Sequence, residues 1–298
     1  MTSKQKALFA IIFAAILGGG IAVFVKIALT EIPIFSLSFF RFLIASLCML
    51  PVIIKSFHKA KQHRSKIIGI SLLATANTVI FSFGVKLTTA TASQILYAIV
   101  PLVIALISYF YLKERLQPQK ILGIILGFIG IAIIILLPAF AKGANVAGSV
   151  SGDLIILIAI LCFSFYSVFS KRLHEHYSSS ELTSYFLLTS LCAQTILAPI
   201  DLHTYPGWWH QVTMTGVFAT LYIGTCGMFL WYILYQYAIK HGSPTIASLT
   251  FYLQPITTFV WAFFLLGERI NGIFIFGAAI TFLGLWITTR TYPEKVLE

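Results

Sequence analysis

The sequence predicts an all-α integral membrane protein with ten transmembrane helices, arranged as two inverted five-helix repeats. Three observations carry this prediction: the composition, the spacing of the apolar runs and an internal duplication. Hydrophobic residues make up 59% of the 298 residues, charged residues only 10%, and the mean hydropathy is +0.94. No water-soluble domain of this size could carry that composition on its surface. We therefore expect the lipid bilayer to be a direct partner of the chain.

The apolar runs have the length of membrane-spanning helices. A span needs about 20 apolar residues, because a helix rises about 1.5 Å per residue across the hydrocarbon core. The runs are unbroken rather than alternating, which favours helices over barrel strands. The first run is too long for a signal peptide and has no cleavage pattern before Thr30. The predicted spans are residues 7–29, 34–54, 66–85, 92–112, 120–140, 153–171, 182–200, 213–239, 245–266 and 271–289.

A duplication organises these spans. Shifting the chain by 154 positions, without a gap, superposes a polar-aromatic span, a Glu-Arg turn and a glycine-bearing span on second copies of themselves. A small, polar connector, residues 141–152, separates the copies and divides the chain into repeats 1–140 and 153–298. The matched pairs are Thr91 and Thr245, Pro101 and Pro255, Glu114 and Glu268, Arg115 and Arg269, Gly123 and Gly277, and Gly130 and Gly284.

An odd number of spans in each repeat means that the two repeats enter the membrane from opposite sides. The basic residues agree, because they gather in alternate connections and leave only Lys86, Lys142 and Arg269 on the other side. By the positive-inside rule, both termini lie in the cytoplasm, and the net charge of +11 reflects topology rather than a nucleic-acid partner. Inverted repeats are typical of secondary transporters with a site at the membrane midplane. We expect the protein in the cell inner (plasma) membrane.

The sequence offers no constellation for catalysis or metal binding. All nine acids fall in loops or at helix ends, and no histidine lies within a predicted span. The four cysteines lie in apolar spans without ligand spacing. We therefore predict that the chain is not an enzyme and that it holds no metal and no cofactor. The two Glu-Arg turns are interpreted as helix connections rather than as chemistry.

Two cations lie within predicted spans, Lys26 near the end of the first and Arg41 inside the second. A charged side chain in the hydrocarbon core raises the free energy, so such residues usually mark functional sites. Lys26 in particular could instead extend its ammonium group to the lipid headgroups. Because no acid lies beside them in the spans, we expect them to attract an anionic group of a substrate.

Polar and aromatic residues form stripes on the spans around the duplicated prolines. The stripes also fit helix packing, but a buried amide needs a hydrogen-bond partner, which a cavity supplies. Pro101 and Pro255 would kink their helices and act as hinges or as packing bends. The paired glycines of the fifth and tenth spans would let helices approach closely, and a homodimer is one expectation from them. The predicted substrate-binding residues are Lys26, Arg41, Asn77, Gln94, Tyr97, Trp231, Tyr235, Ser248 and Tyr252.

Three segments resemble a known family. They are GERINGIFIFGAAITFLG (267–284), its copy KERLQPQKILGIILGFIG (113–130), and the pattern FVK…P…RF over residues 24–42. With the ten-span inverted repeat, they are similar to the EamA-type branch of the drug/metabolite transporter superfamily. The resemblance implies a central cavity lined by the first, third, fourth, sixth, eighth and ninth spans. The chain departs from the family at Lys113, where glycine is usual, and at Gly18-Gly19, where a Trp-Gly pair is common.

These observations together predict a secondary transporter for small metabolites, most simply amino acids or related carboxylates, working by alternating access. The resemblance implies export as the direction. Two alternatives stay open at this point. One is uptake or exchange of a nucleotide-like metabolite, and the other is a membrane scaffold or lipid-handling protein that transports nothing.

Overall fold

The computed structural model describes residues 2–59, 63–87, 96–114, 117–141, 149–266 and 272–290, and over these ranges it contains helices and no strands. The helices are α1 (Ser3–Ala28), α2 (Ile34–Cys48), α3 (Leu50–Lys59), α4 (Arg64–Leu87), α6 (Val100–Tyr111), α7 (Pro118–Ala141), α8 (Val150–Leu173), α9 (Ser179–Thr204), η1 (Trp208–Gln211), α10 (Met214–Tyr222), η2 (Ile223–Leu230), α11 (Trp231–His241), α12 (Pro244–Ser248), α13 (Thr250–Leu266) and α14 (Gly272–Arg290). The linker residues 142–148 and the turn at 267–271 lie outside the described ranges.

Six helical segments of the described chain are long and apolar enough to cross a membrane; they are Ser3–Val25, Val150–Leu173, Ser179–Thr204, Met214–His241, Pro244–Leu265 and Gly272–Arg290. Ile34–Cys48, Val100–Tyr111 and Pro118–Ile134 are shorter apolar helices. The prediction of an all-helical, multi-pass membrane protein is therefore confirmed.

Local sequence explains where several helices begin. Thr2 with Gln5, and Ser178 with Glu181, form reciprocal capping boxes at α1 and α9. Ser149 caps α8 by accepting from the Gly152 amide, 3.1 Å away. These side chains satisfy first-turn amides that have no partner within the helix.

The predicted spans 34–54, 213–239 and 245–266 are single runs in the sequence but broken helices in the structure. The run at 34–54 divides at Met49 into α2 and α3, because Pro51 suits the first turn of a new helix and not the interior of an old one. The run at 245–266 divides at Leu249 into α12 and α13. The run at 213–239 passes from α10 through the π-helical η2 into α11.

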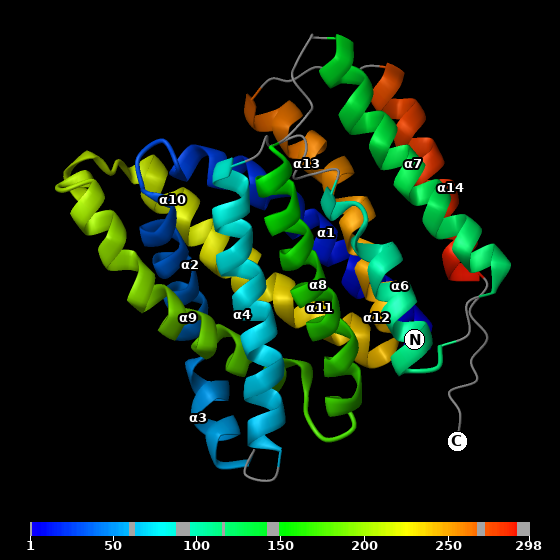
Figure 1. The fold of residues 1–298 in the computed structure, drawn as a ribbon, viewed down its shortest axis with the longest axis horizontal. Helices are drawn as coiled ribbons and strands as arrows, with labels where there is room; N and C mark the ends of the chain where they lie inside the picture. The colour runs from blue at the N-terminus through cyan, green and yellow to red at the C-terminus, as the bar shows by residue number, and fades with distance from the viewer. Residues whose placement is uncertain are drawn as a thin grey trace.

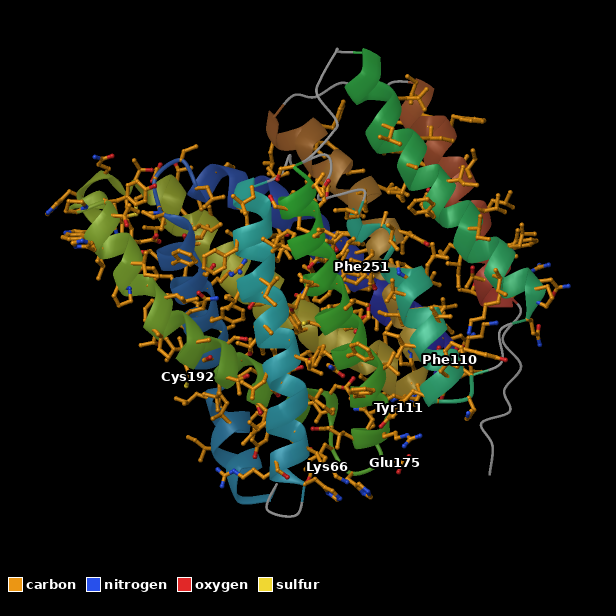
Figure 2. The ribbon with its side chains drawn as sticks, viewed as in Figure 1. Lys66, Phe110, Tyr111, Glu175, Cys192 and Phe251 are labelled. Atoms are coloured by element: carbon orange, nitrogen blue, oxygen red, sulfur yellow. The ribbon has the colours of Figure 1, made fainter. Side chains whose placement is uncertain are left out.

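The helix ends meet at two opposite faces of the bundle (Figure 1). At one face, which we call the basic face, α3, α6, α8 and α11 end (Figure 1), and Lys171 contacts the Gly242 carbonyl there. Lys66 and Glu175 lie at this end in Figure 2, whereas Phe251 lies inside the bundle. At the opposite face, Asp201 of α9 accepts from the Ser36 amide of α2 at 2.7 Å.

Helices α7 and α14 form a pair at the edge of the bundle, antiparallel and side by side (Figure 1). Their glycines face one another: a Cβ placed on Gly130 would lie 2.6 Å from the Gly277 carbonyl oxygen, and one on Gly123 would lie 2.6 Å from that of Gly284. These glycines therefore serve a helix contact within the chain. Since these glycines already contact one another within the chain, they no longer support a homodimer. The homodimer stays a prediction.

We expect Gly130→Ala to destabilise the protein, because the added methyl group meets backbone that cannot move aside. Overpacking of this kind costs about 1–3 kcal/mol. Gly69→Ala is the matched control, since Gly69 lies within α4 and a Cβ there meets nothing within 4 Å. The control should be neutral or slightly stabilising, because alanine is the better helix former. Apparent melting temperatures of the two variants in detergent test this; equal melting temperatures would contradict the close approach of α7 and α14.

Candidate functional site

A cavity of about 430 Å³ lies in the interior of the bundle. Its walls come from α1, α2, α4, α8, the η2–α11 segment and α13, together with residues 97 and 98. The lining side chains are Ile21, Val25, Arg41, Asn77, Thr78, Phe81, Tyr97, Ala98, Phe163, Gly227, Met228, Trp231, Tyr232, Phe251, Gln254, Pro255 and Thr258.

Among the described residues, Arg41 is the one charged residue in this lining. Its guanidinium carbon lies 5.3 Å from the centre of the Phe42 ring, and it makes no hydrogen bond or ion pair to any described residue. Its Nε atom is buried without a partner. A guanidinium holds five N–H donors in a planar fork that matches a carboxylate. The cavity therefore presents an unneutralised cation to whatever enters it.

Asn77 and Tyr97 form a fixed polar pair on the wall. The Asn77 amide donates to the Tyr97 hydroxyl at 2.7 Å and to the Ala159 carbonyl of α8 at 2.8 Å. Both amide hydrogens are thereby used, so Oδ1 remains as an acceptor, and the Tyr97 hydroxyl keeps its proton to donate. The Tyr97 ring packs edge-on against Phe81, with centres 4.9 Å apart.

An aromatic wall faces this polar pair. Trp231 stacks on Tyr235 with ring centres 5.0 Å apart and an interplanar angle of 7°. Phe251 lies against Trp231, Tyr97 and Phe163, with centre distances of 6.0, 6.2 and 5.3 Å. Offset and edge-on rings at these distances give a rigid apolar surface.

The structure brings five of the predicted residues into the lining, namely Arg41, Asn77, Tyr97, Trp231 and Pro255. Tyr235 lies one layer behind Trp231, fully buried, with its hydroxyl 3.0 Å from that of Ser167. Gln94 and the side chain of Lys26 fall outside the described residues.

Ser248 and Tyr252 lie away from the cavity. The Ser248 hydroxyl donates to the Thr245 carbonyl at 2.7 Å, and the Tyr252 hydroxyl donates to the Ile124 carbonyl of α7 at 3.0 Å. The stripe assumed one continuous helix, but the break at Leu249 places Ser248 in α12. Tyr252 and Pro255 share α13, and the Tyr252 side chain reaches α7. Tyr252 therefore fastens α13 to α7 instead of facing the cavity.

The two duplicated prolines occupy different positions. Pro101 lies in the first turn of α6, where the missing N–H has no helical partner to lose, so it follows a break rather than bending the middle of a helix. Pro255 lies inside α13 and lines the cavity. Their role as hinges stays a prediction.

Sequence reasoning missed Tyr232, Phe163 and the face of α13 formed by Phe251, Gln254 and Thr258. The spacing of these last three, at i, i+3 and i+7, fits one face of a helix. The stripe through Tyr252 fits another face equally well, so spacing alone did not decide between them. The π-helical η2 carries no such signal. It places Gly227 and Met228 at the cavity, and π-helical segments are frequent at functional sites.

Between the cavity and the basic face, polar contacts join the two halves of the chain; we call them the basic-face network. Glu114 accepts from the Ser243 hydroxyl at 2.9 Å and from the Thr245 hydroxyl at 3.0 Å, and it pairs with Lys120. Glu114 thus does more than connect two helices. Lys113, where glycine is usual in the resembled family, has a φ of 57°, which glycine adopts without strain.

Helix α8 supplies the rest of the basic-face network. Lys171 donates to the carbonyls of Ile239, Lys240 and Gly242 at 2.8, 3.1 and 2.6 Å. Arg172 donates to the Tyr111 carbonyl at 3.0 Å, and its guanidinium carbon lies 4.2 Å from the centre of the Tyr111 ring. These contacts close the bundle at the basic face.

His174, which directly follows α8, completes the basic-face network through a hydrogen bond of 2.8 Å between its Nε2 and the Gln236 side-chain oxygen. Burial lowers the pKa of His174 to about 4, although the Gln236 hydrogen bond acts in the other direction. The ring is therefore neutral at pH 7, in keeping with the nearby cations Lys171 and Lys240, which also lower this pKa.

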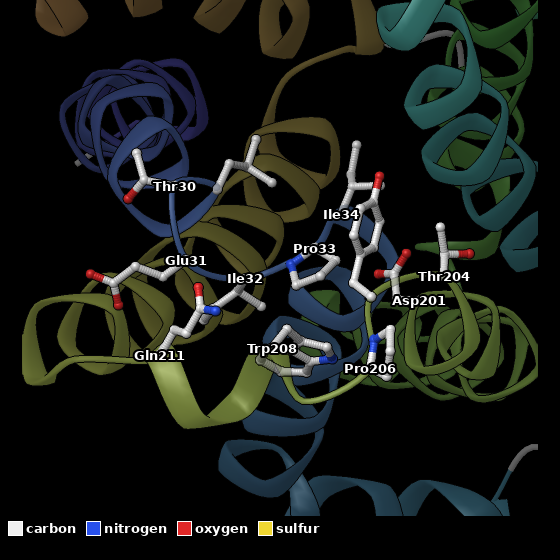
Figure 3. Close-up of a pocket in the computed structure, with 12 residues that line it drawn as sticks. Thr30, Glu31, Ile32, Pro33, Ile34, Asp201, Thr204, Pro206, Trp208 and Gln211 are labelled. Atoms are coloured by element: carbon white, nitrogen blue, oxygen red, sulfur yellow. The ribbon is translucent and has the colours of Figure 1, made fainter.

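A second pocket, of about 670 Å³, opens at the opposite face between the α1–α2 turn and the end of α9 (Figure 3). Its two acids are already used as helix caps. Asp201 binds the Ser36 amide, and Glu31 binds the Thr213 amide and hydroxyl at 2.7 and 2.8 Å. The central cavity, with its unpaired cation, is therefore the better candidate for the functional site.

Comparisons with known proteins agree with this architecture. The model of the EamA-like transporter family matches the chain twice, over residues 5–136 and 150–290. An uncharacterized transporter of Archaeoglobus fulgidus is 29% identical over 97% of this chain and 98% of its own length. The uncharacterized transporter YetK of Bacillus subtilis is 23% identical over 97% and 88%. Protein PecM of Dickeya dadantii is 26% identical over 66% of each chain.

A crystal structure of a protein with 18% sequence identity has a TM-score of 0.83, covering 96% of this chain and 97% of the other. At this identity the likeness establishes the fold alone.

The buried neutral His174 predicts a specific loss of stability in acid. The unfolded chain takes up a proton near pH 6.5, and the folded chain only near pH 4, so stability falls as the pH drops through this window. At pH 5 the loss is about 2 kcal/mol relative to pH 7. We expect His174→Gln to melt with a smaller difference between pH 7 and pH 5 than the parent protein. His203→Gln, at the exposed opposite face, should keep the parent's difference; equal differences in all three proteins would contradict the burial of a neutral His174.

Proposed function

Because the chain belongs to the EamA-like transporter family, we propose that it is a secondary transporter that moves small amphipathic carboxylates, amino acids among them, by alternating access. The observation that carries the proposal is Arg41, an unpaired cation in a central cavity walled by aromatic rings. A carboxylate would bind the guanidinium fork, and the apolar part of the molecule would pack against Trp231 and Phe251.

The general function, transport across a membrane, is established. The family match and the names of the relatives make the chain a membrane transporter and not an enzyme, with a small-molecule substrate and the lipid bilayer as its surroundings. The carboxylate substrate and the alternating-access mechanism are our proposals, and export as the direction stays an expectation from the resemblance.

We propose that the chain is an inverted repeat of five spans and five spans. In a two-fold arrangement, if residue i contacts the equivalent of j, then j contacts the equivalent of i. Under the shift of 154, Gly123 corresponds to Gly277 and Gly130 to Gly284, and the observed contacts are Gly123 with Gly284 and Gly130 with Gly277. This reciprocity is what a two-fold axis between α7 and α14 would produce.

The lining of the cavity has the same relationship. Asn77 corresponds to Trp231, and Tyr97 corresponds to Phe251, and all four side chains line the cavity. A site formed by equivalent positions of two repeats lies on their shared axis, which favours a site near the membrane midplane.

The charges favour an orientation in the inner membrane with both termini cytoplasmic. Basic residues concentrate at the basic face, where α1 begins, α3 ends and α14 ends. The positive-inside rule assigns that face to the cytoplasm. In this orientation the basic-face network would lie between the cavity and the cytoplasm.

Counterflow into proteoliposomes tests the transport function. Vesicles containing the full chain and loaded with a mixture of amino acids and aromatic carboxylates should accumulate the labelled compound of the same class. Arg41→Gln should lower exchange about 10- to 100-fold, because a charge-assisted hydrogen bond contributes about 1.5–3 kcal/mol. Lys66→Gln, exposed at the basic face, should exchange like the parent protein. Exchange of adenine-bearing compounds alone would replace the carboxylate class by a nucleotide-like one.

Glu114→Gln should open the basic face, because Lys120, Ser243 and Thr245 lose the charge that joins them. The reporter is Thr258→Cys, a cavity residue, in a background without the four native cysteines. An impermeant thiol reagent should label it only from the opposite face in the parent protein, and from the basic face as well in Glu114→Gln.

Two controls fix the meaning of this labelling. Ser248→Cys, in a fully buried and hydrogen-bonded position, should stay unlabelled. Glu31→Gln removes a cap at the opposite face and should not admit reagent from the basic face. If no reagent reaches the reporter thiol from either face, the result would argue against alternating access and in favour of a scaffold that transports nothing.

A further inference from the structure

The cavity has an unbalanced charge that narrows the substrate class within the proposed function. Among the described residues, Arg41 is the one full charge in the lining, and no carboxylate accompanies it there. In the sequence, no acid occurs between Glu31 and Glu114, the segment that supplies Arg41, Asn77 and Tyr97. The acids of the pocket at the opposite face, Glu31 and Asp201, are held as helix caps. The described lining therefore offers no anion to pair with a second cation in the cavity.

From this charge balance we infer that the cavity accepts amphipathic monocarboxylates without a free ammonium group, such as N-acylated amino acids and aryl-substituted carboxylic acids, in preference to zwitterionic amino acids. The inference rests on the proposed transport function and sharpens its substrate class. A monoanion makes the occupied cavity neutral, whereas a zwitterion leaves it with the charge of Arg41 and adds a second cation nearby. In a low-dielectric site, that difference favours the monoanion.

The neutral acceptors of the wall support the same assignment. A free ammonium group donates three hydrogen bonds, and an amide N–H donates one. The side-chain amide oxygens available in the lining are Oδ1 of Asn77 and Oε1 of Gln254, whose amide nitrogen is engaged with the Gly18 carbonyl at 3.1 Å. Either oxygen satisfies one amide N–H of an acylated amino acid. The Tyr97 hydroxyl keeps a proton to donate to the acyl carbonyl.

The aromatic wall suits the rest of such a molecule. Phe81, Phe163, Trp231 and Phe251 present ring faces and edges to the cavity, and its volume lies within the roughly 300–1,000 Å³ of small-molecule sites. Ring faces also attract an ammonium group by cation–π contact. Arg41 already occupies the same low-dielectric space, however, and its repulsion opposes that contact.

The test uses four phenyl compounds that differ chiefly in charge: N-acetylphenylalanine and 3-phenylpropionate as monoanions, phenylalanine as zwitterion and phenylalanine amide as cation. Each competes for counterflow in proteoliposomes of the full chain, with protein-free vesicles reporting passive leak. The two monoanions should compete at concentrations about tenfold or more below that of phenylalanine, and the amide should not compete. Phenylalanine competing as well as its N-acetyl derivative would overturn this inference and leave the transporter standing. No exchange with any compound would overturn both.

Variants that change the charge of the cavity lining test whether this charge sets the substrate preference. Arg41→Gln should remove the advantage of the monoanions. Gln254→Glu places an anion in the lining and should shift preference toward phenylalanine. Asn77→Asp is the second such variant, in case Gln254→Glu fails to fold because its bond to Gly18 is lost. A folded acidic variant that keeps the parent's preference for monoanions would contradict the role given to charge.

Discussion

The structure depends on one electrostatic constraint, a cation that lies in the central cavity of a membrane-spanning bundle. A charged side chain in the hydrocarbon region costs several kilocalories per mole unless it faces water, a partner or a ligand. Arg41 has no acid partner among the described residues, so the cavity beside it is a requirement for its charge and not an accident of packing. The π-helical η2 and the broken helix of α12 and α13 supply walls of this cavity, and its described lining holds no carboxylate that would neutralise Arg41.

Two irregular segments, the break at Leu249 and the π-helical η2, adjoin residues that line the cavity. In α13, Phe251, Gln254 and Thr258 line the cavity and the Tyr252 hydroxyl binds α7, while the break at Leu249 places Ser248 in the separate helix α12. Met228 of the π-helical η2 and Trp231 of α11 both line the cavity. Local irregularity in a membrane helix is tolerated when it lines a cavity, because water or a ligand then satisfies the freed polar groups.

Sequence reasoning found the class of protein and five of the 17 residues that line the candidate site, for identifiable reasons. Arg41, Asn77 and Trp231 stand out because charge, amide and indole groups are rare in apolar runs. Phe251 and Phe163 did not stand out, since a phenylalanine in a membrane span has the same appearance whether it faces lipid or a cavity. Ser248 and Tyr252 were assigned to the cavity by their helical spacing from Pro255, but Ser248 lies in the separate helix α12 and the Tyr252 hydroxyl binds α7. The contacts of Glu114 with Ser243 and Thr245 join residues far apart in the sequence, and no local pattern encodes them.

The duplicated positions have diverged in a way that gives the cavity two unlike sides. Asn77 and Tyr97 are polar, and their equivalents Trp231 and Phe251 are the rings of the aromatic wall. Arg41 belongs to the first copy as well, so the group that binds an anion and the surface that binds an apolar body come mainly from different repeats. An amphipathic substrate bound across them would contact both repeats at once. Its binding energy would then act on the angle between the repeats, which is the coordinate along which an alternating-access transporter moves.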